Sequence, residues 1–336
     1  MKQTYNLKDV AKLAGVSLGT ASKVINTIYV RPELRIKVES AMAELNYTPN
    51  AIARSLKANT TKTIGIMIPD ISSPVVGKIL KGIEQVSRMA GYSLLIYNTS
   101  RDLNAEKDAI QTFMINKVDG IIYSGNTVTD ETAAKLKETR IPVVFVMTDY
   151  NSRDFSSVTI DNMEAAFHAV DHLCRCGHSR ILMLAGEADD PNAGIPRLAG
   201  YQKALAAHGI PYQDSLIFWG GYNLERGFTD MKAALSAGLD FSAVFAVSDD
   251  VAIGAMKALN EAGIRVPQDI SVMGFDGIDM ISYTIPSLTT ISQPFEQLGV
   301  ECTKILIDRM KDGKGNTRLT LPFKLINNAS VAPYKG

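Results

Sequence analysis

From Thr63 onward, short apolar segments alternate with longer amphipathic segments. Apolar runs without polar alternation are typical of strands buried on both faces, and helical segments between such strands supply the crossovers of a parallel sheet. The expected strands are residues 63–68, 93–98, 118–123, 142–146 and 157–160 in the first half of this body, and 180–185, 216–219, 243–247 and 270–275 in the second. The pattern predicts an α/β fold with two doubly wound, Rossmann-like subdomains.

The amphipathic segments between these strands have the spacing of helices that cover a sheet. The expected helices are residues 77–90, 104–115, 130–138, 162–176, 197–208, 224–236 and 249–262. Ligands of such folds bind beyond the carboxyl ends of the strands, so we expect a ligand cleft between the two halves. Candidate groups for that cleft are Asp70, Ser73, Arg197, Tyr222, Ser248, Asp249 and Asp276. The alternative for each of them is a helix cap or a surface ion pair.

The first sixty or so residues follow a different pattern. Leu7–Ala14 reads as an amphipathic helix, Gly15 breaks it, and Ser17 can cap a second helix over Leu18–Asn26. Pro32 opens a third helix that runs to about Leu45. A helix, a turn with glycine and a capped second helix form the helix-turn-helix pattern.

The second helix of such a unit enters the major groove of DNA, and the residues at its start face the base edges. Here these are Leu18, Gly19 and, one turn later, Lys23. Lys23 can donate to guanine, and Leu18 can contact a thymine methyl group. Short polar side chains suited to phosphate oxygens surround them, namely Ser17, Thr20, Ser22 and Asn26. The alternative for the pattern alone is a three-helix module that binds protein.

Charge is distributed unevenly although the whole chain has no net charge. Residues 1–61 contain nine basic and four acidic side chains, which gives this segment a net charge of +5 and the remainder −5. A basic segment attached to an acidic body favours a polyanionic partner for the basic segment.

Three segments give the chain a specific resemblance to a known family. "LKDVAKLAGVSLGTASKVIN", "ELNYTPNAIARSLK" and "TKTIGIMIPDIS" resemble the LacI/GalR family of bacterial transcriptional repressors, and the resemblance runs from about residue 5 to residue 334. It implies a homodimer that binds double-stranded operator DNA under the control of a small-molecule effector. It also implies a hinge helix on the operator, with DNA contacts from Ala53, Arg54, Leu56 and Lys57. Leu56 would be the wedge that enters the minor groove.

The resemblance also implies a division of the chain into domains. Residues 1–49 would form the helix-turn-helix domain, and residues 50–61 the hinge helix and linker. An effector-binding core of the periplasmic-binding-protein type would follow. Its N-terminal subdomain would comprise residues 62–161 and 292–324, and its C-terminal subdomain residues 162–291 and 325–336. The chain ends just beyond the last expected strand, without leucine heptads, so we expect a dimer and not a tetramer.

In the family, effector contacts fall at the positions of Arg197, Tyr222, Ser248 and Asp276, whereas the position of Asp249 can serve as a helix cap. Arg197 is the one cation that we place in the cleft. An arginine and a carboxylate together match vicinal hydroxyl groups, which donate and accept, so we expect a carbohydrate effector. Valines at positions 75 and 76 replace an aromatic pair common in relatives, and Met147 replaces an acidic residue. A nucleobase or nucleoside, or a protein co-effector of a global catabolite regulator, remains the alternative.

The sequence predicts neither catalysis nor a cofactor. Its four histidines are scattered, and it contains no phosphate-binding loop and no nucleophile elbow. Cys174, Cys176 and Cys302 form an odd set without metal-ligand spacing, as expected for reduced thiols. The start, MKQTYNLKDV, lacks the apolar segment of a secretory signal, and no apolar run approaches the length of a membrane span. We therefore expect a cytoplasmic protein. The open alternatives are an α/β enzyme, which would need a nucleophile and base in the cleft, and a secreted binding protein, which would need a signal peptide.

Overall fold

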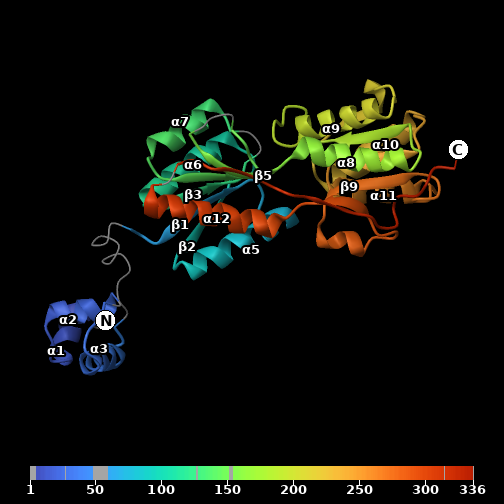
Figure 1. Ribbon diagram of the computed structural model, residues 1–336. Helices are drawn as coiled ribbons and strands as arrows, with labels where there is room; N and C mark the ends of the chain where they lie inside the picture. Colours follow the sequence, from blue (N-terminus) through green and yellow to red (C-terminus); the bar gives the residue numbers. More distant parts are fainter. Residues whose placement is uncertain are drawn as a thin grey trace. The chain divides into compact units, whose positions relative to one another are not determined.

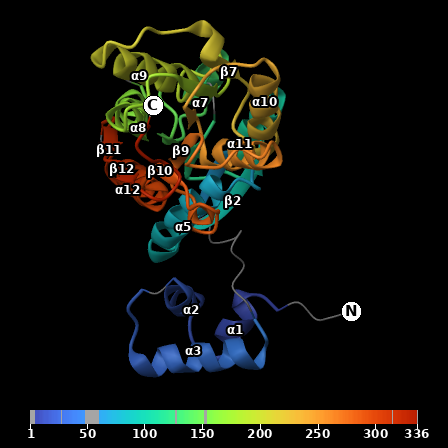
Figure 2. The ribbon, with the colours of Figure 1, turned by 90° about the vertical axis from the view of Figure 1, so that its right-hand side faces the viewer.

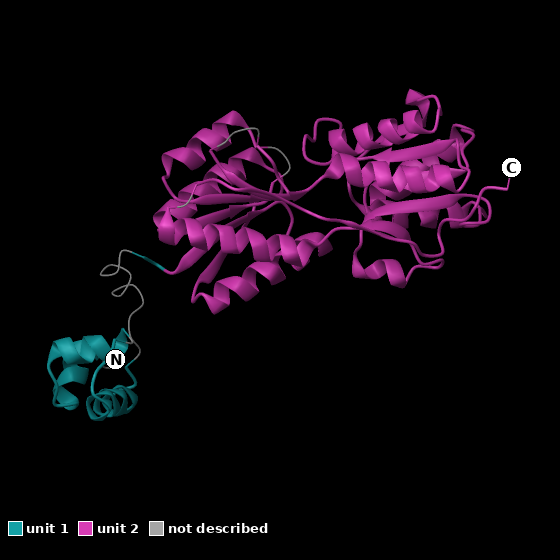
Figure 3. Ribbon diagram, viewed as in Figure 1, with its two compact units in different colours: residues 1–61 teal, residues 62–336 magenta. Residues whose placement is uncertain are grey.

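The computed structural model describes residues 5–26, 28–47, 60–125, 128–150, 154–313 and 315–335. The chain forms two compact units, residues 1–61 and residues 62–336 (Figure 3). Four predicted hinge contacts, Ala53, Arg54, Leu56 and Lys57, lie outside the described residues.

The first unit contains the three helices expected from the sequence. They are α1 (Leu7–Leu13), α2 (Leu18–Ile25) and α3 (Pro32–Glu44). Asn6 and Asp9 form a capping box at the start of α1, and Gly15 adopts a φ of +64° in the turn to α2, a conformation that favours glycine. Val10, Ala21 and Val38, one from each helix, are buried in a common core. The helix-turn-helix prediction is confirmed.

The first sheet of the second unit is parallel and has the strand order β11-β5-β4-β3-β1-β2. Its strands are β1 (Thr63–Ile68), β2 (Ser93–Asn98), β3 (Gly120–Tyr123), β4 (Val143–Val146), β5 (Ser156–Ile160) and β11 (Arg318–Leu321). Helices α5 (Pro74–Met89) and α12 (Phe295–Asp312) lie on one face of this sheet (Figure 1), and their apolar side chains pack against it. Those of α6 (Leu103–Ile115) and α7 (Asp130–Glu138) pack on the other face.

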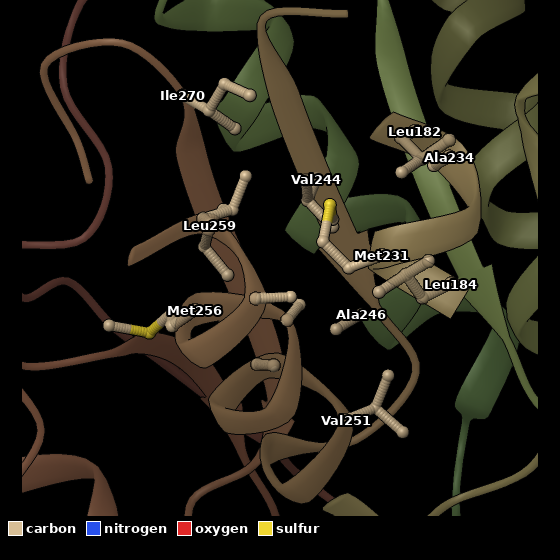
Figure 4. Close-up of a cluster of buried hydrophobic side chains, with 14 of the residues drawn as sticks. Leu182, Leu184, Met231, Ala234, Val244, Ala246, Val251, Met256, Leu259 and Ile270 are labelled. Atoms are coloured by element: carbon tan, nitrogen blue, oxygen red, sulfur yellow. The ribbon is translucent and has the colours of Figure 1, made fainter. Parts of the chain in front are cut away.

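The second sheet has the order β12-β10-β9-β8-β6-β7, with β12 antiparallel. Its strands are β6 (Ile181–Ala185), β7 (Ile217–Trp219), β8 (Ala243–Ala246), β9 (Ser271–Asp276), β10 (Thr289–Ser292) and β12 (Lys324–Ile326). Helices α8 (Asn162–Arg175) and α9 (Gly194–Ala207) cover one face, and α10 (Leu224–Ser236) and α11 (Asp249–Glu261) the other (Figure 2). Short 3-10 helices span Asp214–Leu216 and Asp279–Ser282. Figure 4 shows side chains such as Leu184, Met231 and Val244 meeting in the core under α10 and α11.

The chain passes between the two sheets at three places, after Ile160, after Ser292 and between Leu321 and Lys324. The expected α/β fold with two doubly wound sheets is confirmed. Helix α12, which follows the second passage, was not predicted, and α5 begins at Pro74, three residues before its expected start. In the described ranges, no helix is both long and apolar enough to cross a membrane.

Glycines allow unusually close contact between neighbouring helices in both halves. A Cβ atom on Gly82 of α5 would lie 2.0 Å from the carbonyl oxygen of Glu296 on α12, and a Cβ on Gly299 would lie 2.2 Å from the carbonyl oxygen of Ile79. The same reciprocal arrangement joins Gly227 of α10 and Gly254 of α11. These pairs bring the helix axes together where any side chain would force them apart.

We predict that Gly82→Ala lowers the free energy of unfolding by about 1–3 kcal/mol, because the added methyl group overlaps the backbone of α12. Gly77→Ala on the same helix is the matched control, since a Cβ there meets nothing within 4 Å. The control should be more stable than the wild type by about 0.5–1 kcal/mol, the helix propensity difference between the two residues. Urea unfolding of both variants measures the effect, and equal stability of the two variants would contradict it.

Candidate DNA interface and effector site

The start of α2 presents an exposed surface made of Leu18, Gly19 and Lys23. Leu18 is 46% exposed although it is apolar, so it is not part of the core of this unit. Ser17 caps the helix: its Oγ accepts a hydrogen bond from the backbone N–H of Thr20 at 3.1 Å. The cap leaves the side chains of Leu18 and Lys23 free to face a partner.

The polar residues around this surface are partly engaged within the helix. The hydroxyl groups of Ser17 and Thr20 lie 2.9 Å apart, and Nδ2 of Asn26 donates to the carbonyl oxygen of Ser22 at 2.8 Å. These bonds fix the side chains locally and leave further acceptor capacity on each hydroxyl. Gly19 is not required for packing, since a Cβ added there would meet only Ser17 Oγ, at an ordinary distance of 3.7 Å.

Arg197 is the centre of the polar cluster in the second half of the body. It lies in the first turn of α9 and is only 3% exposed. Its Nε donates to Oδ1 of Asn162 at 2.9 Å, and its Nη1 donates to the carbonyl oxygen of Val247 at 2.5 Å. The guanidinium group stacks over the ring of Phe275, 3.7 Å from the ring centroid. Hydrogen bonds and stacking therefore hold it in one orientation.

Asp276 ends β9 beside this guanidinium group. Its Oδ1 lies 4.0 Å from Arg197 Nη1 and accepts a hydrogen bond from Nε2 of Gln293 at 2.7 Å. The residue has a φ of +129°, a conformation that L-residues rarely adopt, so its backbone is strained. Surrounding contacts must hold it there. The structure thus brings together Arg197 and Asp276, the two groups expected to anchor an effector.

Asp249 supplies one of those contacts. Its side chain is completely buried, and its Oδ2 accepts the backbone N–H groups of Gly277 at 2.6 Å and Ile278 at 2.9 Å. Its Oδ1 accepts the hydroxyl of Thr290 on β10 at 2.6 Å. Both oxygens are therefore occupied by donors of the protein. Asp249 fixes the loop that follows Asp276, which differs from the expected direct contact with an effector.

Burial raises the pKa of the Asp249 carboxyl, and the neighbouring Asp276 carboxylate raises it further. Burial also raises the pKa of Asp276, while Arg197 and Gln293 oppose that shift. Both shifts have the same direction because a carboxylate loses its hydration when it is buried, and one arginine does not compensate two such groups.

The raised pKa values predict how stability changes with pH. As pH rises from about 4, the ordinary carboxyl pKa, the unfolded chain releases protons that the folded protein still holds. The free energy of unfolding should therefore fall as pH rises toward neutrality. Asp249→Asn keeps an acceptor for Gly277 and cannot ionise, so it should reduce this fall. Urea unfolding from about pH 4.5 to about pH 8.5 measures both slopes, and an unchanged slope in the variant would refute the assignment.

Tyr222 and Ser248 belong to the same cluster. The hydroxyl of Tyr222 donates to Oδ2 of Asp190, a buried carboxylate that also accepts the backbone N–H of Asn192 at 2.8 Å. Ser248 is the N-cap of α11, and its hydroxyl donates to the carbonyl oxygen of Tyr222 at 3.0 Å. Burial raises the pKa of Tyr222, so its hydroxyl remains protonated and able to donate. The alternative to an effector contact for Ser248, a helix cap, is thus present, and its contact with an effector stays a prediction.

The two candidates of the first half lie apart from these contacts. Asp70 is exposed, and its Oδ1 accepts the backbone N–H of Ser72 at 2.8 Å and its hydroxyl at 2.7 Å. These bonds lower the pKa of Asp70, so it remains ionised. Ser73 occupies the N-cap position of α5 without a side-chain cap bond. Over the described ranges, no hydrogen bond joins either residue to Arg197 or Asp276.

Several residues of the site were not predicted from the sequence. Asn162 holds Arg197, Asp190 holds Tyr222 and Gln293 holds Asp276. Each of these partners lies at least seventeen positions away in the chain. Local patterns carry no signal for such contacts. A weak signal did exist for Gln293, because it directly follows a strand.

Contacts also cross between the two halves of the body. Arg101 Nη1 lies 2.5 Å from Glu187 Oε1, and the Arg101 guanidinium lies 5.7 Å from the centroid of the Tyr222 ring. Lys78 Nζ lies 2.8 Å from Asp279 Oδ1. The expectation that Arg197 is the one cation of the cleft was therefore wrong, since two residues of the first half bring cations to the second.

The surface of the described part of the chain includes one cavity of about 470 Å³ and another of about 330 Å³. Arg140 and Arg309 line the first, and Leu224, Phe228 and Ile253 line the second. Neither contains any predicted effector residue. Among the described residues, no group of histidine, cysteine and carboxylate side chains has the arrangement of a metal site.

The chain matches "Bacterial regulatory proteins, lacI family" over residues 6–50 and "Periplasmic binding protein-like domain" over residues 170–331. It is 40% identical over 306 residues to the HTH-type transcriptional regulator RegA of Clostridium acetobutylicum, covering 90% of this chain and 91% of that protein. It is 37% identical over 307 residues to the ribose operon repressor of Escherichia coli strain K12, covering 90% and 92%. A crystal structure of the lac repressor dimer bound to operator and the anti-inducer ONPF superposes with a TM-score of 0.88 at 29% identity, covering 98% of this chain and 100% of that one. The chain therefore belongs to the LacI family of bacterial regulatory proteins.

Proposed function

We propose that this LacI-family regulator is a repressor of carbohydrate-utilisation genes. A sugar bound at Arg197 and Asp276 would set its affinity for operator DNA. The observation that carries this proposal is the buried pair itself, because the pair offers rigid donors beside an acceptor. The relatives RegA and the ribose operon repressor are regulators, which also supports the proposal.

For DNA binding, we propose that Leu18, Gly19 and Lys23 face the base edges in the major groove. Ser17, Thr20, Ser22 and Asn26 would contact the phosphates, and Ala53, Arg54, Leu56 and Lys57 would act as the hinge on the operator. One head in each subunit of a homodimer would read one half of a near-palindromic site. The exposure of Leu18 and Lys23 at the start of α2 supports this assignment, because it leaves both side chains available for contact with the base edges.

We predict that Lys23→Ala weakens specific operator binding by about 1–3 kcal/mol, the range for one base-reading side chain. Lys37→Ala, which removes an exposed cation from α3, is the control. The measurement is fluorescence anisotropy on an operator selected from random DNA and on a scrambled sequence, at several salt concentrations. Equal losses on both DNAs would reassign Lys23 to a phosphate contact.

For the effector, the charges near the anchors favour a neutral, hydroxyl-rich molecule. Arg197 already lies 4.0 Å from Asp276 and donates hydrogen bonds to Asn162 and to the carbonyl oxygen of Val247, so it has little capacity left for an added anion. Tyr222 could cover an apolar face of a sugar. Two relatives were solved with sugars, one with bound ribose and one as a CelR–cellobiose complex, which supports the carbohydrate class.

Two other effectors remain candidates because a specific observation favours each. The edge of a nucleobase also presents donors and acceptors that match an arginine and a carboxylate. Catabolite control protein A of Priestia megaterium is 32% identical over 319 residues, which favours the alternative of a catabolite regulator. The ligand screen therefore includes a nucleobase as a separate arm.

We predict that D-ribose or another sugar raises the melting temperature of the full chain, whereas hypoxanthine does not. Arg197→Ala and Asp276→Ala should each weaken sugar binding by about 1–3 kcal/mol, because they leave polar groups of the ligand and the site unpaired. Calorimetry on folded variants measures the loss, with Lys203→Ala, an exposed substitution on α9, as control. Unchanged affinity in both anchor variants would place the effector elsewhere.

A further inference from the structure

Both backbone polar groups of Gly277 are held by side chains. Its N–H donates to Asp249 Oδ2 at 2.6 Å, and its carbonyl oxygen accepts a hydrogen bond from Lys78 Nζ at 3.1 Å. The same Nζ lies 2.8 Å from Oδ1 of Asp279, two residues further along the loop. Asp249 belongs to the second half of the body, whereas Lys78 lies on α5 of the first half. The loop that carries Asp276 is thus joined to both halves.

The contact of Asp249 with this loop and the contact of Lys78 with it differ in strength. Asp249 is completely buried, so its bonds to the loop are protected from water. The side chain of Asp279 is 90% exposed and that of Lys78 is 28% exposed. An exposed ion pair contributes little by itself and is screened by salt, so the contact of Lys78 can open and close with little change in free energy.

We propose that Lys78 is a positioning residue that couples the effector anchor Asp276 to helix α5. The inference rests on the proposed effector site and concerns how a change at that site alters the position of α5. A ligand that engages Asp276 fixes the strained backbone at this residue, which keeps the carbonyl of Gly277 and the carboxylate of Asp279 where Lys78 can bind them. When Asp276 is released, the loop moves, and α5 loses its contact with the second half.

Helix α5 can pass on a displacement because it packs in backbone contact with α12. Gly82 and Gly299 bring these two helices into backbone contact, so a displacement of α5 is shared by α12. Helix α12 itself begins at Phe295, directly after the passage of the chain at Ser292 and Gln293. The Lys78 contact therefore joins the anchor to the same pair of helices that the chain enters at that passage.

The helix also supplies a matched control. Lys81, three residues beyond Lys78, pairs with Glu296 on α12 at 2.8 Å between Nζ and Oε2. This pair has the same chemistry and lies on the same helix, but it stays within the first half. Lys81→Ala removes a cation from α5 and leaves both hydrogen-bonding partners of Lys78, Gly277 and Asp279, in place; it changes the contact between the halves only through the electrostatic effect of Lys81 on Asp279.

The test uses the full chain without ligand or DNA, so it does not depend on the identity of the effector. Gln293→Ala releases Asp276 by removing its hydrogen bond, and Thr290→Val, which removes a donor from Asp249, is a second way to loosen the loop. Amide hydrogen exchange is measured in residues 74–81. Releasing Asp276 should speed exchange there about fivefold, at the lower end of typical coupling between sites.

This increase in the exchange rate of residues 74–81 should be the same in the Lys81→Ala background. It should be absent in the Lys78→Ala background, where the contact is already lost. An equal increase in both backgrounds would overturn the proposal. As a second arm, Lys78→Arg, which can still donate to the carbonyl of Gly277 and pair with Asp279, should keep the response that Lys78→Ala abolishes. A folded Lys78→Arg variant that lacks the response would also overturn the proposal.

The outcome is distinguishable from failure of the proposed function. Coupling in the exchange experiment together with no stabilisation by D-ribose would uphold the role of Lys78 and count against ribose as the effector. Stabilisation by D-ribose without coupling would uphold the effector site and remove Lys78 from its mechanism.

Discussion

The carboxylate of Asp249 is the interaction on which the polar cluster of the second half depends. It joins the start of α11, the loop after β9 and strand β10 through three hydrogen bonds, in a place where no water replaces a lost donor. The strained backbone of Asp276 persists because the following residues are tied in this way. Arg197 is fixed from the opposite side by Asn162 and Phe275. Contacts within the protein therefore hold Arg197 and Asp276, the two proposed anchors, near each other.

Much of the fold could be predicted because its signals are local. Apolar runs such as Thr63–Ile68 showed the strands, and Gly15 with the cap at Ser17 showed the turn between α1 and α2. Helix α12 was missed because it starts after Pro294 without a side-chain cap, so a local start signal is absent. The arrangement of the site was beyond reach for a different reason. Contacts such as Arg197 with Asn162 join residues that only the folded sheet brings together.

The role of Asp249 shows how composition alone misleads. In the sequence, an aspartate after a strand is equally suited to bind a ligand or to cap a helix, and both readings place it at the carboxyl edge of the sheet. The structure adds a third role: the buried carboxyl group of Asp249 accepts the backbone N–H groups of Gly277 and Ile278 and so holds the loop after β9, while Ser248 is the N-cap of α11. Arg101 illustrates the converse, since nothing near it in the sequence indicates that it crosses to Glu187 and the ring of Tyr222.

The open space above Gly19 has a consequence for how such a regulator can change over time. A side chain can be added at the exposed start of α2 without disturbing the three-helix core, because the nearest atom is an ordinary contact distance away. Stability therefore places little restriction on this codon. If residue 19 faces the base edges as proposed, selection for a new target sequence can act on it directly. A duplicated copy of the gene could acquire a different set of operators through one nucleotide change, while the effector-sensing body stays as it is.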